Sequence, residues 1–403
     1  MSSDTAERPR LPVTAFMSAA LFFTGITYAS TLPYAGIVAI DGLGISDGAY
    51  ALILSVSSLV SAAAAVALGY LSDRIADRRL LVIATALLGA LGYGLIYVAR
   101  NPLAYIIAYC VIMPFGGALF SQTFAYARSY YNARRPDRAE FLVTMLRTTF
   151  AIAWVLVPPV AGWIAATYAV FDVYALASAA YLACALTYAL LLADGTTHIG
   201  TATKSATPAE PAANGIELPM LVGIGGVLLI MVAIQLNATT APLAIVRNFG
   251  GTAAEVGIYA SLAALLEIPC MLAWGLAAQR FKKHWLIVAS ATVYALYLFL
   301  FGQARTVTDV YWLQGFNAVA TAGLMSIPIG YMQEAIRGRV GLSTSLLDVV
   351  AVASRLIAAG IFGLVTAGAG YLPIFPIAAA LSLSGVAVLY LAHGVIRRNP
   401  AAA

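Results

Sequence analysis

The chain has 403 residues, of which 62% are hydrophobic and 10% are charged, and its net charge is +5. Soluble domains carry about 25% charged residues, so this composition predicts a membrane protein with several spans. The apolar runs are continuous and do not alternate, which excludes a β-barrel. The first apolar run is too long for the core of a signal peptide. The basic residues form no segment long enough to bind nucleic acid.

Catalytic and metal chemistry are not indicated. The three cysteines lie within apolar runs and lack the spacing of a disulfide framework or a metal site. The three histidines lie in predicted loops or at helix ends, which argues against a histidine proton relay and a hydrolytic triad. No nucleotide-binding loop follows a strand. We therefore expect no enzyme activity, no metal and no cofactor.

About 20 apolar residues are needed to cross the hydrocarbon core as a helix. Twelve such helices are predicted, at residues 14–40, 49–70, 80–99, 103–127, 141–169, 172–193, 218–246, 255–278, 285–303, 308–331, 343–366 and 371–395. Glycine, proline and threonine are frequent in the break between the sixth and seventh helices. The predicted domains are an N-terminal six-helix half at 1–193, a flexible cytoplasmic linker at 194–217 and a C-terminal six-helix half at 218–403.

The lysine and arginine positions predict the orientation in the membrane. Most of the 22 basic residues lie in the termini, the linker and the loops after the second, fourth, eighth and tenth helices. The opposite side has only Arg100, Arg247 and Arg305. Both termini are therefore expected in the cytoplasm.

The two halves repeat in sequence. Residues 29–33 (Ala-Ser-Thr-Leu-Pro) match residues 238–242 (Ala-Thr-Thr-Ala-Pro) in the seventh helix. Residues 43–46 match residues 249–252, which lie 206 positions further on. Parallel six-helix repeats imply a two-fold axis along the membrane normal. A substrate site is then expected between the halves, near the midplane.

Glycine and proline shape the predicted helices. We expect Gly116, Gly117, Gly360 and Gly363 to allow close helix approach. The pair Pro158-Pro159 frees backbone carbonyls and bends the fifth helix. Whether this bend tunes closure or is a passive kink stays open, and the glycines have no predicted role in the site.

Residues 69–79, Gly-Tyr-Leu-Ser-Asp-Arg-Ile-Ala-Asp-Arg-Arg, resemble the loop 2–3 signature of the major facilitator superfamily. The resemblance covers nearly the whole chain. It implies the major facilitator fold, an all-α membrane protein with twelve transmembrane helices in two six-helix halves. It also implies that Asp73, Arg74 and Arg78 form a cytoplasmic gate. The sequence departs from the signature at Asp77, where the pattern usually has glycine.

Two further segments, residues 147–159 and residues 266–269, resemble the bacterial sugar efflux transporter family. That resemblance implies a proton-coupled carrier that exports sugars or sugar-like molecules across the bacterial inner membrane by alternating access. The fourth helix departs from many proton antiporters, because it lacks an arginine within the membrane. The expected partners are a small-molecule substrate, protons and the lipid bilayer, with the chain acting as a monomer.

Glu267 lies near the centre of the eighth helix. A carboxylate at that depth costs about 2.5–3.5 kcal/mol on insertion scales and marks a functional site by default. Arg355, at the midpoint of the eleventh helix, is expected to pair with Glu267 or Asp348. These three residues form the predicted proton-coupling group. The alternative is a fixed ion pair that only holds helices together.

Six further side chains are predicted to contact the substrate. They are Tyr28, Gln122, Arg147, Trp154, Asn237 and Asn317. Buried amides need partners, and an aromatic face suits the C–H face of a sugar. Tyr28 occupies the position of Asn237 in the first repeat. Five of the six have a structural alternative: the amides could bond a neighbouring helix, the indole could pack in the core, and the arginine could extend to the interface.

Three other functions remain open at this stage. A multidrug/proton antiporter of the same fold would need a mainly aromatic and aliphatic cavity with a single carboxylate. The amides and the two arginines within helices favour hydroxylated substrates instead. A membrane sensor that keeps the fold without transport is opposed by the intact Asp73-Arg74 pair. Fold and orientation do not set the direction of transport, so sugar import also stays open.

Overall fold

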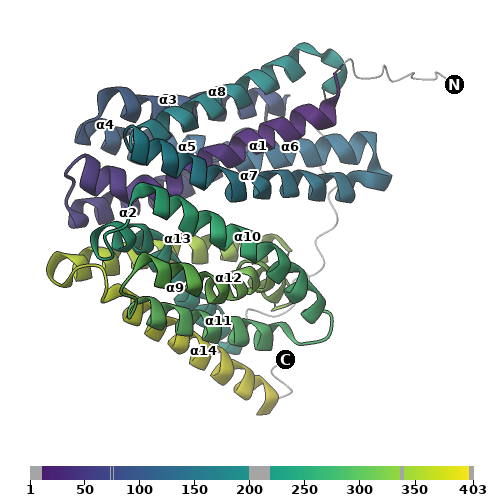
Figure 1. Cartoon of the computed structure of the whole chain (residues 1–403). Helices are drawn as coiled ribbons and strands as arrows, with labels where there is room; N and C mark the ends of the chain where they lie inside the picture. Colours follow the sequence, from purple (N-terminus) through teal and green to yellow (C-terminus); the bar gives the residue numbers. More distant parts are fainter. Residues whose placement is uncertain (1–10, 73, 76, 199–217, 336–339, 399–403) are drawn as a thin grey trace. The chain divides into compact units, whose positions relative to one another are not determined.

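The computed structural model describes residues 11–72, 74–75, 77–198, 218–335 and 340–398. Across these ranges the chain forms helices and connecting segments, with no strand (Figure 1). Eleven helices within them are long and apolar enough to cross a membrane. The remaining predicted span corresponds to α12 (Val307–Ala335), which carries a polar face. The predicted all-α membrane fold is confirmed.

The outer surfaces of the helices are apolar. Large side chains with more than half of their surface exposed include Leu52, Val66, Val98, Trp312 and Leu364. A soluble protein rarely exposes apolar patches of this extent to water. The hydrocarbon core of a bilayer removes them from water, which explains how such a surface is tolerated.

The described residues group into two compact units. Unit 1 lies between Met1 and Gly44 and between Leu59 and Ser205; unit 2 lies between Ile45 and Ser58 and between Ala206 and Ala403. The two units therefore share one helix, α2. Its first turns belong to unit 2, where the Tyr371 hydroxyl donates a hydrogen bond to the Asp47 carboxylate at 2.9 Å.

Unit 1 contains the first six predicted spans except for the first turns of the second. Its helices are α1 (Val13–Thr31), α2 (Asp47–Ser72, in part), α3 (Arg78–Ala99), α4 (Pro102–Ile107), α5 (Met113–Gly116), α6 (Leu119–Arg134), α7 (Ala139–Thr167) and α8 (Asp172–Ala193). Helix α1 packs against α7 and α8, and α3 packs against α8.

Unit 2 contains the last six predicted spans. Besides α12, its helices are α9 (Leu218–Arg247), α10 (Ala253–Ala277), α11 (Lys283–Phe301), α13 (Val340–Ala369) and α14 (Ile374–Arg398). Helix α9 packs against α13 and α14, and α11 packs against α14. These pairs reproduce, helix for helix, those of α1 with α7 and α8 and of α3 with α8. The sequence repeat is therefore also a repeat of packing.

Equivalent glycines lie three residues before the second helix of each repeat, α2 and α10. Gly44 and Gly250, which are 206 residues apart, have φ angles of +67° and +66°. Only glycine adopts this left-handed conformation without strain. After Gly250, Thr252 and Glu255 form a capping box at the start of α10.

Two predicted helices are less regular than their apolar runs indicate. The run at 14–40 forms α1, a short 3-10 turn at Leu32–Tyr34 and a π-helical turn at Ile37–Gly42, because Pro33 cannot donate a backbone hydrogen bond. The run at 103–127 extends to Arg134, with a π-helical turn between α4 and α5 and a break between α5 and α6. Arg134, expected in a loop, therefore lies on a helix.

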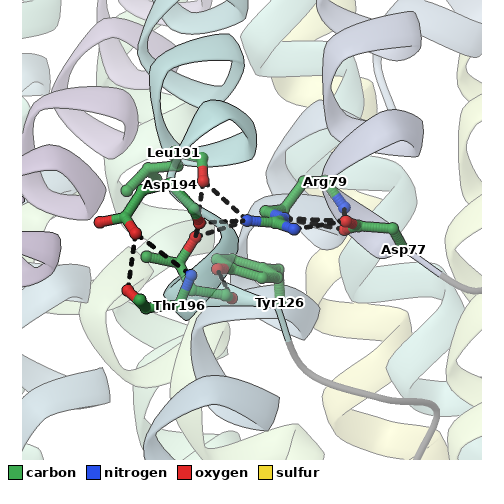
Figure 2. A network of polar contacts seen from close by, with 7 residues as sticks. Asp77, Arg79, Tyr126, Leu191, Asp194 and Thr196 are labelled. Atoms are coloured by element: carbon green, nitrogen blue, oxygen red, sulfur yellow. Dashed lines mark hydrogen bonds and ion pairs between the residues drawn. The ribbon is translucent and has the colours of Figure 1, made fainter. Parts of the chain in front are cut away.

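The predicted flexible linker begins with an ordered turn, η5 (Gly195–Thr197), which is a correction to the sequence prediction. Figure 2 shows the cause, a buried guanidinium: Arg79 is 2% exposed. It donates to the backbone carbonyls of Leu191 and Asp194 at 2.7 and 3.3 Å. It also donates to the Thr197 hydroxyl at 2.5 Å. These bonds fix the start of the linker to unit 1.

Two more contacts complete this network. The Tyr126 hydroxyl on α6 donates to the backbone carbonyl of Thr197 at 2.8 Å. The backbone N–H of Leu11 donates to the Asp194 carboxylate at 3.2 Å. The segment before α1, the end of α8 and the first turn of the linker are therefore held together. The rest of the predicted linker, 199–217, lies outside the described residues.

Asp77, which departs from the family signature, is the carboxylate partner of Arg79. Its oxygens accept hydrogen bonds from the Arg79 guanidinium and backbone N–H, and it caps α3. Burial alone would raise the pKa of Asp77, but the hydrogen bonds and the charge of Arg79 outweigh burial and lower it. The acid in place of glycine thus keeps a buried arginine paired.

Candidate functional site

Glu267 lies half-buried on α10, facing α12. The Thr321 hydroxyl on α12 interacts with its carboxyl group and donates a hydrogen bond to the backbone carbonyl of Asn317 at 2.8 Å. A hydroxyl has one proton, so in this position it can accept a hydrogen bond from protonated Glu267. An ionised carboxylate can only accept, so a hydrogen bond from Thr321 to ionised Glu267 would require the hydroxyl to turn away from the Asn317 carbonyl.

One face of α12 is polar over two turns, because Gln314, Asn317 and Thr321 are spaced three and four residues apart. Gln314 is fully buried. Its Nε2 donates to the backbone carbonyl of Val310 at 3.0 Å. Its Oε1 accepts from Nδ2 of Asn317 at 2.8 Å.

The carbonyl of Val310 fixes the polarity of this chain of bonds. A carbonyl oxygen can only accept, so the amide nitrogen of Gln314 must face it and the amide oxygen must face Asn317. The Asn317 amide is oriented in turn, and its Oδ1 is left buried without a partner among the described residues. Asn317 therefore presents an acceptor, and a group that binds there must be a hydrogen-bond donor.

A second buried network lies beside this face. The Tyr297 hydroxyl on α11 donates to Oδ1 of Asn237 on α9 at 3.3 Å. The Tyr259 hydroxyl on α10 lies 3.1 Å from that of Tyr297 and donates to it, since the proton of Tyr297 is already used. Gln314 also interacts with Tyr297. Three predicted site residues, Asn237, Asn317 and Glu267, thus lie in unit 2 among polar side chains of four helices.

The other two residues of the predicted proton-coupling group lie apart from this network. Asp348 and Arg355 are both exposed on α13. Within the described residues, Arg355 forms no ion pair with Glu267 or with Asp348. The expected pairing of Arg355 is therefore not seen in this structure, and Glu267 is not locked to an arginine.

Unit 1 gathers two predicted residues around three phenylalanines. The ring of Tyr28 on α1 meets that of Phe150 on α7 edge-on, with centroids 6.2 Å apart. Phe150 contacts Phe120 at 4.6 Å, and Phe120 contacts Phe124 at 4.7 Å. The guanidinium carbon of Arg147 lies 5.8 Å from the centroid of Phe124. We call Phe120, Phe124 and Phe150 the phenylalanine cluster.

Tyr28, Gln122 and Trp154 are held differently. The Tyr28 hydroxyl donates to the carbonyl of Gly117, at the break between α5 and α6, at 2.6 Å. Gln122 on α6 is buried, and its Oε1 has no partner within the described part of the chain. Trp154 is half-buried against the core cluster that contains Ala153. Gln122 thus keeps a free acceptor, whereas the indole packs against the core.

The predicted gate is only partly described. Asp73 lies outside the described residues. The Arg74 guanidinium is exposed and stacks on Tyr70 at 4.1 Å from the ring centroid. Arg78 donates to the Ser129 hydroxyl on α6 at 3.1 Å. Both described gate residues therefore contact their own unit, and their role as a gate stays a prediction.

Residues 17–219 match the Major Facilitator Superfamily, which is half of the chain. The chain belongs to the Major Facilitator Superfamily. Members of this superfamily are membrane transporters, so the chain is a transporter and not an enzyme. Sugar efflux transporter A of Dickeya chrysanthemi is 29% identical over 96% of this chain and 97% of that protein. Sugar efflux transporter B of Salmonella typhimurium is 27% identical over 86% of this chain and 87% of that protein.

A solved transporter structure has the same fold. The crystal structure of a nucleoside transporter superposes with a TM-score of 0.78 at 12% identity, covering 95% of this chain and 99% of that chain. At this identity the likeness shows the fold alone. It confirms the predicted major facilitator fold.

Sequence reasoning missed several polar residues of this transporter. Gln314 and Thr321 flank the predicted Asn317 at helical spacing, and that spacing could have identified them. Tyr259 and Tyr297 could not be told from ordinary core tyrosines, because their roles depend on contacts between helices. Arg79 was counted among the basic loop residues although it is buried.

Proposed function

We propose that this transporter exports sugars or sugar-like molecules by alternating access, driven by the proton gradient. The named relatives, which match almost end to end, support a sugar substrate. The single observation that carries the coupling is Glu267 beside the polar face of α12, without an arginine partner among the described residues. A carboxyl group in a membrane helix that is free of a fixed ion pair can exchange its proton during transport.

The local chemistry supports two states of Glu267. Protonated, it donates to the Thr321 hydroxyl, which keeps its bond to the α12 backbone. Ionised, it requires that hydroxyl to turn toward it. Proton binding therefore changes the hydrogen bonding between α10 and α12. The acceptor of Asn317, one turn away on α12, is suited to a substrate hydroxyl.

Glu267→Gln tests the proposal, because glutamine keeps the shape but cannot exchange a proton. We expect proton-driven efflux from liposomes to be lost, with exchange of substrate for substrate retained and independent of pH. Glu255→Gln is the matched control: it lies on the same helix, within the capping box, and should keep both activities. If efflux by Glu267→Gln kept the pH dependence of the wild type, Glu267 would not be the group that carries the proton.

A multidrug/proton antiporter is a second candidate, and the phenylalanine cluster favours it. Aromatic rings with one nearby cation-bearing side chain, Arg147, suit flat lipophilic molecules. The melting temperature of the protein, measured with sugars and with lipophilic drugs, distinguishes sugar transport from multidrug transport, since a ligand stabilises the state to which it binds. Stabilisation by sugars alone supports sugar transport; stabilisation by drugs alone supports the antiporter.

We also propose that the protein is a monomer in the bacterial inner membrane with both termini in the cytoplasm. The excess of Lys and Arg in alternate loops supports this orientation. Cysteine labelling from outside checks it: a cysteine at Arg305 should react with an impermeant reagent in whole cells, and one at Arg138 should not.

A further inference from the structure

Where α11 begins and α14 ends, exposed aromatic rings from both helices form one surface. Trp285 on α11 is 49% exposed and Tyr390 on α14 is 62% exposed. Their rings meet edge-on with centroids 5.9 Å apart. Beside them, the rings of His284 and His393 stack at 3.9 Å, with an angle of 17° between the planes. These two contacts join the helix ends, and we call the surface the α11–α14 patch.

Cations border this patch, and the two helices that form it carry no acidic residue. Arg280 and Lys282, in the loop before α11, are exposed and form no ion pair among the described residues. Neither α11, nor α14, nor the loop before α11 contains an aspartate or a glutamate. Lys283 is different, because its ammonium group faces Gly330 on α12. Among the residues whose side chains the structure describes, the exposed positive charge of the patch therefore comes from Arg280 and Lys282.

Another basic loop of this protein differs in this respect. Arg135 and Arg138, between α6 and α7, are exposed, and the Arg138 guanidinium lies 3.7 Å from the Asp137 carboxylate. Glu140 follows in the first turn of α7. That loop carries acids among its cations, whereas the α11–α14 patch does not. A general preference for basic loops on one side of the membrane does not account for this difference.

The combination of groups matches the interface of a bilayer. Trp and Tyr settle at the level of the lipid headgroups, and the neighbouring Phe281 is 62% exposed. Arg280 and Lys282 then lie at the depth of lipid phosphates. Each cation near an anionic membrane surface contributes about 1 kcal/mol, which is about fivefold in affinity.

We propose that the α11–α14 patch binds an anionic phospholipid. Arg280 and Lys282 hold the phosphate group, while Trp285 and Tyr390 pack against the glycerol and the upper part of the acyl chains. The two stacked histidines keep α11 and α14 at the separation that the lipid spans. The bound lipid stabilises the contact between these two helices.

The test uses the full-length protein in detergent, titrated with phosphatidylglycerol or phosphatidylcholine and followed by native mass spectrometry and thermal unfolding. We expect phosphatidylglycerol to bind and to raise the melting temperature, and phosphatidylcholine to do neither. The double variant Arg280→Gln/Lys282→Gln should bind phosphatidylglycerol more weakly by about fivefold per charge removed. The matched control Arg135→Gln/Arg138→Gln should bind as the wild type does.

Two further measurements separate a lipid site from a simple cluster of charge. Trp285→Ala should weaken phosphatidylglycerol binding although it removes no charge. Soluble glycerol phosphate should not replace the lipid. Equal binding of both lipids, equal loss in the two double variants, or full stabilisation by glycerol phosphate would each overturn the proposal.

Discussion

A single buried guanidinium holds together one end of unit 1. Arg79 bonds a carboxylate, two backbone carbonyls and a hydroxyl that come from α3, α8 and the first turn of the linker. Arginine suits this place because its planar fork of donors can serve several acceptors at once. Breaking a buried ion pair leaves a charge without compensation, and that typically costs about 3–5 kcal/mol.

Replacing this residue should therefore destabilise the protein. Arg79→Met leaves the Asp77 carboxylate without its guanidinium partner and removes one donor from each of the carbonyls of Leu191 and Asp194, so we expect a loss of about 3–5 kcal/mol in unfolding free energy. Arg79→Lys should lose less, because it keeps the charge. Thermal or denaturant unfolding in detergent measures both. The neighbour Arg78, which bonds only Ser129 in the described structure, provides the control: Arg78→Met should lose about 1 kcal/mol or less.

At the scale of elements, glycines decide which helices approach closely. A Cβ atom added at Gly116 on α5 would lie 2.7 Å from Cα of Gly89 on α3. Gly89 in turn faces the ring of Tyr181 on α8. A Cβ atom at Gly360 on α13 would meet nothing within 4 Å. The expectation of close approach therefore holds at Gly116 and fails at Gly360.

The same substitution should then have opposite effects at these two sites. Gly116→Ala forces backbone apart and should destabilise the protein by about 1–3 kcal/mol. Gly360→Ala meets no neighbour and should stabilise α13 by about 0.5–1 kcal/mol, because alanine has the higher helix propensity. Melting temperatures of the two purified variants check the prediction. A melting temperature of Gly116→Ala at or above the wild-type value would contradict it.

Sequence reasoning identified the helices better than the contacts between them. The helix predicted at 172–193 coincides with α8, because its apolar run is uninterrupted. The run at 14–40 was read as one helix, since hydropathy does not register the turn that Pro33 introduces. Glu267 and Asn317 could be found from their depth in apolar runs. The orientation of the Asn317 amide depends on the Val310 carbonyl and Gln314, so it requires the structure.

At the scale of the whole molecule, a repeated scaffold carries different chemistry in its two units. The packing of α1 with α7 and α8 recurs as that of α9 with α13 and α14. Unit 2 has a carboxyl group beside the polar face of α12. Unit 1 has the phenylalanine cluster and the Arg79 network instead. The proposed proton coupling therefore depends on the side chains around Glu267 in unit 2, and not only on the depth of its carboxyl group in the membrane.

Moving the carboxyl group between the repeats tests this dependence. Ser61 on α2 is the counterpart of Glu267, 206 residues earlier, and it lies in unit 1. In the double variant Ser61→Glu/Glu267→Ser, the acid occupies the equivalent position of the first repeat. There it is no longer beside Thr321 and the polar face of α12. We expect proton-driven efflux to fall about tenfold or more and to match that of Glu267→Ser alone, with substrate exchange retained.

Ser61→Glu alone controls for the added charge and should keep proton-driven efflux. Restored coupling in the double variant would show that membrane depth alone suffices and that the polar face of α12 is dispensable.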